Sequence, residues 1–390
     1  ALIKSNLSLE ELKFKLEKKN EIRYLEANSR VYASGIEPND SYFDSQSNYS
    51  LIDLPAAWTQ KTGSSLLRVA VLDTGIALSH PDLEARIDYD NAYNFVAANN
   101  NVEDDEGHGT HVAGIIGATT DNNLGIAGSS WEGEILPLKV LDQNGSGGYA
   151  VIADAILYAA GLLESPSNPE PVDIINLSLG GSYDSALLKD AVQRATAAGV
   201  IIVASSGNDG LSEILYPAAY PETIAVGAVD EFGNQASYSN YSSALDIVAP
   251  GGSKQSGILS TYLDNRYQSL AGTSMAAPHV SGVISLMLAN GIYPEEVRDI
   301  LKENSIHPGR AEFSSELGFG LLNASFAVNN TSKIKVVVGE RKSESIDIVK
   351  EKVIPLKGGS YNFEELPLGE YRIYAWIDTT DDNLINAGDY

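Results

Sequence analysis

Residues 67–75 read LRVAVLDTG, in which the apolar run from Val69 to Leu72 ends in an aspartate and a turn. Apolar residues at successive positions indicate a strand that is buried on both faces. Similar short β-branched runs recur along the chain, at 133–142, 172–180, 200–207, 223–229 and 245–251. Helical patterns lie between several of them, as at 150–163 and 186–199. This alternation predicts an α/β fold with a mostly parallel sheet flanked by helices.

The composition limits the kinds of protein that this chain can be. It has 390 residues, and its 52 Asp and Glu against 26 Lys and Arg give a formal charge of −26. A nucleic-acid partner requires a basic face, so we expect none. The chain has no cysteine, which excludes disulfides, thiol catalysis and cysteine zinc sites. No stretch approaches the roughly eighteen uninterrupted apolar residues of a membrane span, so no span is predicted.

The residue pattern changes twice along the chain, which predicts three parts. Residues 1–34 combine a capped helical pattern with a strand pattern, and about thirty residues cannot bury a core alone. Residues 35–330 carry the α/β pattern. Residues 331–390 alternate as short strands with turns, which predicts a small all-β sandwich as an accessory module. The chain starts at Ala1 without a methionine, so we expect a processed product whose terminal units are incomplete.

Two motifs at strand ends suggest functions that the rest of the sequence does not support. Asp73, within DTG, could be half of an aspartic protease, but no second Asp-Thr-Gly or Asp-Ser-Gly occurs in the chain. The stretch VLDQNGSGGYA fits a dinucleotide-binding loop through Gly145, Gly147 and Ala150. The next predicted strand ends in glycines rather than in the acid that would hold a ribose, so nucleotide binding is not predicted.

The stretch EDDEGHGTHVAG at 103–114 places two histidines, His108 and His111, behind a run of carboxylates. The pair could hold a metal, or one ring could transfer protons with the help of a carboxylate. A zinc site needs at least a third strong ligand and usually His-Glu-x-x-His spacing, which is absent here. We therefore expect no histidine zinc site, and proton transfer stays open.

Ser274 lies in AGTSMAAPHVSG at 271–282, where small residues lead into an apolar helix. A serine at a helix start is usually a cap. The same position also offers backbone N–H groups and the positive end of the helix dipole, which suit a nucleophile that generates an oxyanion. This stretch alone favours the cap.

Three motifs taken together change this interpretation. Asp73-Thr74-Gly75, the segment from His108 to His111, and Gly272-Thr273-Ser274 occur in that chain order. With SLGG at 178–181, SSGNDG at 205–210 and YPAAYP at 216–221, the chain resembles the subtilisin-like serine proteases of the thermitase-like type, over roughly Asp40 to Val328. The resemblance implies a secreted serine endopeptidase that forms an acyl-enzyme.

The resemblance also implies residue roles. Asp73, His108 and Ser274 would form the catalytic triad, with His108 as general base and His111 in a structural position. The Asn208 side-chain amide and the Ser274 backbone N–H would bind the oxyanion. Two segments would hold an extended peptide between them by main-chain hydrogen bonds. They are Gly145, Ser146 and Gly147 on one side and Ser178, Leu179 and Gly180 on the other.

Substrate preference and the N-terminal unit follow from the same resemblance. Leu215 would limit the depth of the pocket for the residue before the cut, which implies broad specificity with an apolar preference there. Residues 1–34 resemble the end of a propeptide that folds against the catalytic domain, so the expected partners are protein and peptide substrates and the chain's own propeptide. The junction would lie between Tyr32 and Glu37.

Calcium is the expected structural cofactor, because hard oxygen ligands from three separate segments suit this ion. The resemblance gives side-chain ligands from Asp40, Asp82 and Asn122 and carbonyl ligands from Thr119, Leu124 and Ile126. Asp246 resembles a weaker cation site. A second calcium loop of thermitase-like members falls at 94–103, where Asn94, Ala97 and Asn99 stand in place of carboxylates, so that site is expected to be weakened.

Two other functional classes stay open at this point. One is a catalytically silent or autoinhibited binding protein on the same scaffold, which intact triad residues disfavour. The other is a hydrolase of non-peptide substrates, which the peptide-binding segments disfavour.

Overall fold

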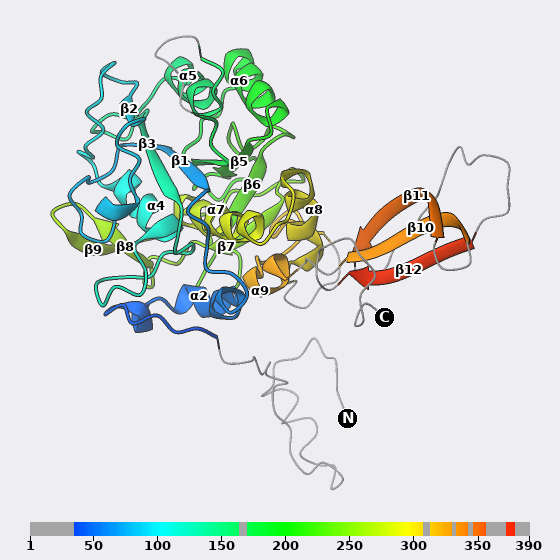
Figure 1. Ribbon diagram of the computed structural model, residues 1–390. Helices are drawn as coiled ribbons and strands as arrows, with labels where there is room; N and C mark the ends of the chain where they lie inside the picture. The colour runs from blue at the N-terminus through cyan, green and yellow to red at the C-terminus, as the bar shows by residue number, and fades with distance from the viewer. Residues whose placement is uncertain are drawn as a thin grey trace, which may run out of the picture.

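The computed structural model describes residues 35–163, 170–306 and 313–329, together with the backbone of three strands further along the chain. The propeptide-like unit predicted at 1–34 lies outside the described residues. Figure 1 shows the arrangement of the helices and strands, in which one large sheet occupies the centre of the α/β part.

The central sheet contains seven strands in the order β2-β3-β1-β4-β5-β6-β7, and every neighbouring pair is parallel. Its strands are β1 (Arg68–Asp73), β2 (Tyr93–Asn94), β3 (Glu134–Lys139), β4 (Ile174–Leu177), β5 (Ile201–Ser205), β6 (Ile224–Val229) and β7 (Ile247–Pro250). From β1 to β7 nearly all strand residues are buried, as expected for a sheet covered on both faces. The predicted mostly parallel sheet flanked by helices is confirmed.

The strand order reverses at β1. The chain first adds β3 on one side of β1 and then crosses to add β4 on the other side. In open parallel sheets a crevice forms beyond the carboxyl ends of the strands at such a reversal, because the connections leave on opposite faces. The segments that follow β1, β3 and β4 therefore border one crevice.

Helices cover both faces of the sheet, with α5 and α6 side by side on one face and α4 and α7 on the other (Figure 1). α7 packs against α4 and against β4 to β7, and it is buried from Thr273 to Met287. A helix at the centre of the protein is packed on all sides, so it needs an apolar surface all round. The helices are α2 (Ser47–Leu51), α3 (Leu54–Trp58), α4 (His108–Gly117), α5 (Tyr149–Ala159), α6 (Ala186–Ala197), α7 (Thr273–Ala289), α8 (Pro294–Asn304) and α9 (Ala324–Val328), with short 3-10 turns η1 (Phe43–Ser45) and η2 (Glu84–Arg86).

The segment before β1 is fastened to the core by aromatic packing and by one amide. Trp58 packs edge to face against Tyr49 and Trp131, with ring centroids 5.7 and 5.3 Å apart. The Gln46 side chain accepts from the Ala127 backbone N–H at 2.8 Å and donates to the Ala127 carbonyl at 2.9 Å. A two-bond amide contact of this kind fixes the path of the N-terminal segment next to residues 119–127.

Two smaller sheets follow. β8 (Ile258–Tyr262) and β9 (Arg266–Leu270) form an antiparallel hairpin that packs against α4. β10 (Lys333–Arg341), β11 (Ile346–Pro355) and β12 (Arg372–Asp378) form an antiparallel sheet in the order β11-β10-β12. These strands agree with the all-β character predicted for 331–390, and the predicted boundaries and the sandwich stay predictions.

Within the described part of the chain, no single helix is long and apolar enough to cross a membrane. α7 and α8 reach the required length and hydropathy only as a pair, and that pair is bent by 119°.

The start of α4 lies unusually close to the end of β1. A Cβ atom on Gly109 would lie 2.1 Å from the Gly75 carbonyl oxygen and 3.0 Å from the Asp73 Cβ. The Gly109 backbone N–H also donates to the Thr74 hydroxyl at 2.9 Å. Position 109 therefore requires glycine, because any side chain would force α4 away from β1.

Gly109→Ala should lower the free energy of unfolding by about 1–3 kcal/mol, the usual cost of overpacking. The clash outweighs the gain of about 1 kcal/mol that alanine brings to a helix. Gly148→Ala is the matched control, because nothing lies within 4 Å of its Cβ position. Urea unfolding of both variants measures the difference, and equal stabilities would contradict the close approach.

Candidate active site

Asp73 ends β1, His108 begins α4, and their side chains meet beyond the carboxyl edge of the sheet. Asp73 Oδ1 lies 2.7 Å from His108 Nδ1 and also accepts from the Thr74 backbone N–H at 2.8 Å. An ionised carboxylate only accepts, so Nδ1 carries a proton, and in the neutral ring His108 Nε2 is the acceptor. The Asp73 side chain is 1% exposed and that of His108 is 25% exposed, so the ring is the part that reaches solvent.

Opposing effects act on the pKa of His108. Burial lowers the pKa, but the charge of Asp73 and its hydrogen bond outweigh burial and raise the pKa to about 9, with smaller contributions from Glu106 and Asp104. Asp73 Oδ2 is buried without a hydrogen-bond partner among the described residues, so few other donors compensate its charge. The surroundings therefore stabilise the imidazolium form that follows proton uptake.

Ser274 lies in the first turn of α7, where it is 9% exposed. Its hydroxyl donates to the Ser178 carbonyl at 3.2 Å, and the Ser178 hydroxyl donates to the Ser274 carbonyl at 2.8 Å. These two bonds fasten the start of α7 to the end of β4. No hydrogen bond joins the Ser274 hydroxyl to the His108 ring in the described structure, so the hydroxyl must turn away from Ser178 before it can donate to His108.

A chain of buried polar groups supports the Ser178 hydroxyl. Asn176, in β4, donates through Nδ2 to Ser178 Oγ at 3.0 Å. Ser281, in α7, donates to Asn176 Oδ1 at 2.8 Å. Because each buried group has a partner, the network fixes the Ser178 side chain and, through it, the backbone at Ser274.

The orientation of the Asn208 amide follows from its neighbour Thr273. Asn208 Oδ1 accepts from the Thr273 backbone N–H at 2.8 Å and from its hydroxyl at 2.9 Å. A backbone N–H can only donate, so the oxygen must face Thr273 and the amide nitrogen is turned away from it. Asn208 is exposed, and its Nδ2 stays next to the Gly272–Ser274 turn.

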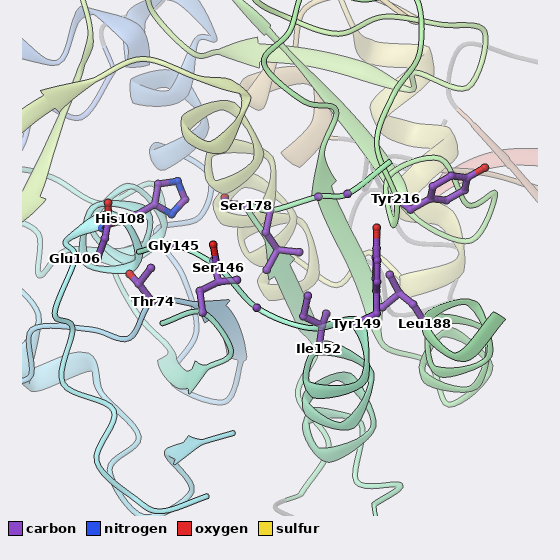
Figure 2. Close-up of a pocket in the computed structure, with 15 residues that line it drawn as sticks. Thr74, Glu106, His108, Gly145, Ser146, Tyr149, Ile152, Ser178, Leu188 and Tyr216 are labelled. Atoms are coloured by element: carbon purple, nitrogen blue, oxygen red, sulfur yellow. The ribbon is translucent and has the colours of Figure 1, made fainter. Parts of the chain in front are cut away.

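A cleft of about 410 Å³ opens beside His108 (Figure 2). The predicted segments form its two rims, with Gly145, Ser146 and Gly147 after β3 and Ser178, Leu179 and Gly180 after β4. Thr74 after β1 completes the arrangement expected at a reversal of strand order. The structure thus brings together both segments that the sequence suggested as peptide-binding.

Several lining residues escaped the sequence analysis. Tyr149, Ile152, Leu188 and Tyr216 form the end of the cleft that lies away from His108 (Figure 2). Tyr149 and Ile152 are three positions apart on α5, which is the same spacing that a core-facing helix shows. Leu215, which was expected at the base of a specificity pocket, does not line this cleft, and it lies against Gly180 and Gly207 instead.

The segments predicted to hold calcium do lie together. Asp40 accepts from the Asp121 N–H at 2.9 Å, and Asp82 accepts from the Asn122 amide at 2.8 Å and from the Ile126 N–H at 3.0 Å. Both carboxylates are buried. Burial raises the pKa of Asp40 and the nearby Asp82 charge adds to this rise, against the backbone hydrogen bonds that lower it.

This cluster is rich in oxygen and carries two buried negative charges. Backbone carbonyls of Thr119, Leu124 and Ile126 belong to the same loop. Tyr267, which the sequence analysis missed, donates its hydroxyl to Asp82 at 2.9 Å. The described residues contain no group of three or more His, Cys, Asp or Glu placed to hold a metal, so a metal here would depend on two carboxylates, one amide and carbonyls.

Asp246, expected to hold a weaker cation, is paired with two cations of the protein. Its carboxylate lies 2.7 Å from Arg298 and 3.2 Å from Lys302. Arg298 also donates to the carbonyls of Pro221 and Thr223, at the end of YPAAYP. The guanidinium thus occupies the position that a cation would take between the carboxylate and these carbonyls.

The side-chain amide of Asn94 closes the loop at 94–103. Asn94 Oδ1 accepts from the N–H groups of Val96 and Ala97 at 3.0 and 2.9 Å. Its Nδ2 donates to the Asn101 carbonyl at 2.7 Å. Both polar atoms of this amide thus have protein partners, and the weakened second calcium loop stays a prediction.

Comparison with known proteins gives the family. Residues 65–320 match the family model described as the subtilase family. The chain belongs to the subtilase family. The match covers the three motifs and the strands that carry them, from β1 to the segment after α8.

This subtilase is similar to two curated relatives and to a solved structure. It is 39% identical over 289 residues to the thermophilic serine proteinase of Bacillus sp. (strain AK1), covering 73% of this chain and 67% of the relative. It is 39% identical over 269 residues to thermitase of Thermoactinomyces vulgaris, covering 69% of this chain and 91% of thermitase. A protease structure from Pseudoalteromonas arctica PAMC 21717 matches with a TM-score of 0.69 and 34% identity, covering 75% and 98% of the two chains.

Family membership confirms the predicted enzyme class, and this subtilase is a serine endopeptidase. The subtilisin-like architecture is also confirmed by the solved protease, which matches the fold over three quarters of the chain.

Two further histidines of the subtilase are buried and uncharged. His111 donates through Nε2 to the carbonyls of Ile258 and Gln268, on the β8–β9 hairpin, and burial lowers its pKa to about 3. His279 donates through Nδ1 to the Met275 carbonyl at 2.7 Å, so its Nε2 accepts from Asn48 at 2.8 Å. Burial lowers the pKa of His279 to about 4. His111 thus holds the β8–β9 hairpin against α4, whereas the His108 ring contacts Asp73 and lines the cleft.

The subtilase should lose stability as pH falls from about 6.5 to about 4. In this window the unfolded state binds a proton at His279 and the folded state does not, so folding weakens on acidification. The lowered pKa of about 4 corresponds to a loss of at most about 3 kcal/mol at this ring. Urea unfolding at pH 7 and pH 4 should show a smaller loss for His279→Gln, with both proteins in a Ser274→Ala background to prevent self-digestion. Equal losses would contradict the assignment.

Proposed function

We propose that this subtilase hydrolyses peptide bonds of proteins through Asp73, His108 and Ser274, by way of an acyl-enzyme. The observation that carries the proposal is the 2.7 Å contact between buried Asp73 and Nδ1 of His108, a residue that lines the cleft, because it leaves Nε2 of the neutral ring as the base. The matched order of the three motifs in a serine protease family supports the same roles.

In this mechanism Ser274 turns from Ser178 toward His108 and gives up its proton to Nε2 as it attacks the substrate carbonyl. Asp73 keeps the ring in the required tautomer and stabilises its positive form without taking the proton. Collapse of the tetrahedral intermediate returns the proton to the leaving amine. Water then repeats the sequence on the acyl-enzyme, with His108 again as base.

The negative oxygen of the tetrahedral intermediate needs donors that are already in place. We assign this role to Asn208 Nδ2 and the Ser274 backbone N–H. Thr273 holds the amide oxygen of Asn208, which leaves its nitrogen available near the nucleophile. Ser274 lies in the first turn of α7, where the helix dipole favours negative charge.

An extended peptide would add as a strand between the rims at 145–147 and 178–180, which border the cleft. Main-chain hydrogen bonds make such binding tolerant of sequence, so broad specificity is proposed. The apolar residue before the cut would lie near Gly207 and Leu215, which are packed together. An autoinhibited state of the enzyme is the second candidate, because the Ser274 hydroxyl donates to Ser178 rather than to His108.

Calcium is proposed as a structural ion at Asp40, Asp82 and Asn122, with carbonyls of Thr119, Leu124 and Ile126. Two buried carboxylates, together with the raised pKa of Asp40, indicate a place where a cation would be stabilised. Bound there, calcium would neutralise both charges and join the N-terminal segment to the loop at 119–126. The Asp246 position is not included, because Arg298 and Lys302 already neutralise it.

The remaining proposals come from the sequence resemblance alone. Residues 1–34 are proposed as a propeptide segment that is cleaved from the peptidase domain at 35–330, and 331–390 as an accessory module. Secretion of the enzyme is part of the same proposal.

Ser274→Ala should abolish labelling by a fluorophosphonate and lower casein hydrolysis by about 10⁶-fold, the loss measured for the nucleophile of a subtilisin. Ser285→Ala, a buried serine on the same helix, should retain both. An unlabelled wild-type chain would support the autoinhibited state. Cleavage of esters without cleavage of casein would support a non-peptide hydrolase.

Removal of calcium with EDTA should lower the melting temperature, since an ion that binds only the folded state adds about 2.7 kcal/mol at a hundredfold excess over Kd. Asp82→Asn should abolish this calcium response. Asp246→Asn is the matched control and should keep it, although the variant loses two ion pairs. A response that survives Asp82→Asn would place the ion elsewhere.

A further inference from the structure

The segment at 206–211 follows β5 at the carboxyl edge of the sheet and carries Asn208. Asn208 is exposed, and no hydrogen bond among the described residues engages its backbone N–H or carbonyl. Its side chain is held through Oδ1, by the N–H and hydroxyl of Thr273. The direction of Asn208 Nδ2 therefore depends on how firmly the residues on either side of Asn208 are fixed.

Asn240 holds the residues on both sides of Asn208. Its backbone N–H donates to the Gly207 carbonyl at 3.0 Å. Its side-chain Oδ1 accepts from the Asp209 N–H at 2.9 Å and from the Leu211 N–H at 3.1 Å. Asn240 is 1% exposed, so water does not compete for these bonds. One buried residue thus fixes the chain immediately before and after Asn208.

Other bonds fasten the main chain around Asn240 to the segment at 206–211. The Ser206 hydroxyl donates to the Asn240 carbonyl at 3.0 Å. The Gly210 N–H donates to the Tyr238 carbonyl at 2.7 Å. Because these bonds use main-chain oxygens, they survive a change of the Asn240 side chain. Shortening that side chain therefore removes the two bonds of Oδ1 and leaves the surrounding bonds in place.

The Asn240 amide lies directly against the backbone that precedes Asn208. Gly207 has a φ of 113°, and a Cβ atom on it would lie 2.4 Å from Asn240 Nδ2. Nδ2 is buried and has no hydrogen-bond partner among the described residues, which costs free energy. What the side chain at 240 supplies is therefore the acceptor Oδ1, and both of its bonds go to the segment that carries Asn208.

We propose that Asn240 is a positioning residue that acts through Asn208 to aim Nδ2 at the oxyanion, an inference that rests on the proposed peptidase function. A donor stabilises a developing charge most when it is in place before the charge forms. An exposed side chain whose own backbone is not hydrogen-bonded turns away easily, and Asn240 limits that motion by fixing both neighbours. Because Asn240 is buried, it does this without touching the substrate.

The test is a cycle of four chains, namely wild type, Asn208→Ala, Asn240→Ala and the double variant, assayed on one peptide amide. Asn208→Ala should lower kcat by about 10²–10³-fold, the loss measured for an oxyanion donor of a subtilisin. Asn240→Ala should lower kcat by about tenfold and change KM by less than about twofold, because the donor remains but is less often in place for the transition state. In the Asn208→Ala background, Asn240→Ala should cost less than about twofold in kcat.

A second variant covers the case in which Asn240→Ala does not fold. Asn240→Ser keeps the buried site polar, and its hydroxyl stops one bond short of the position of Oδ1. It replaces Asn240→Ala in the same cycle, with the same expected pattern.

Asn323→Ala is the matched control for a merely structural role. Asn323 is also 1% exposed, its Oδ1 accepts from the Phe326 N–H at 2.8 Å, and its Nδ2 also lacks a partner among the described residues. This variant should lose stability in urea unfolding and keep the wild-type kcat. A loss of kcat equal to that of Asn240→Ala would overturn the proposal, because general loosening of the fold would then explain both.

Fluorophosphonate labelling separates this proposal from the peptidase function. If Ser274 of the wild type is not labelled and no peptide is cut, the peptidase function fails and the role of Asn240 fails with it. If Ser274 is labelled but Asn240→Ala keeps the wild-type kcat, the Asn240 proposal alone fails. It also fails alone if the losses of Asn240→Ala and Asn208→Ala multiply fully in the double variant, since Asn240 would then act independently of Asn208.

Discussion

The charge of Asp73 is the constraint on which the site depends. Its carboxylate ends a buried strand, where water hydrates it little, so the protein must supply donors. The Thr74 N–H and the His108 ring supply them, and the ring can do so only if α4 begins against β1. Glycine at 109 permits that approach. Lys139, opposite Asp73 in the sheet, holds the entry to α4 through Asp105 and the Thr74 carbonyl.

The reversal of strand order at β1 explains why one crevice receives so many functional groups. β1 contributes Asp73, the segments after β3 and β4 contribute the rims, and α7 brings Ser274 from a distant part of the sequence. Parallel strands end at the same edge, so the groups that follow them converge there. The polar chain through Asn176 and Ser178 then fixes the Ser274 backbone relative to the sheet.

The sequence predicted those parts of the fold and site that show a pattern within a short stretch of residues. Uninterrupted apolar strands predicted the sheet, and motifs at strand ends and helix starts marked Asp73, His108 and Ser274. The aromatic end of the cleft was missed because Tyr149 and Ile152 show the same helical spacing as core residues. The pairing of Asp246 with Arg298 joins residues 52 positions apart, and no local pattern records such a contact. Asp82 and Tyr267 meet across 185 positions for the same reason.

The hydrogen bond between Asn48 and His279 joins residues 231 positions apart, and it links the N-terminal segment to α7, the helix that carries Ser274. Contacts of such high contact order form late, because the entropy of closing a long loop must be met before the contact stabilises anything. A chain still emerging from the ribosome cannot make this contact until α7 has been synthesised. The N-terminal segment can therefore be joined to α7, the helix that carries Ser274, only after most of the domain has been synthesised.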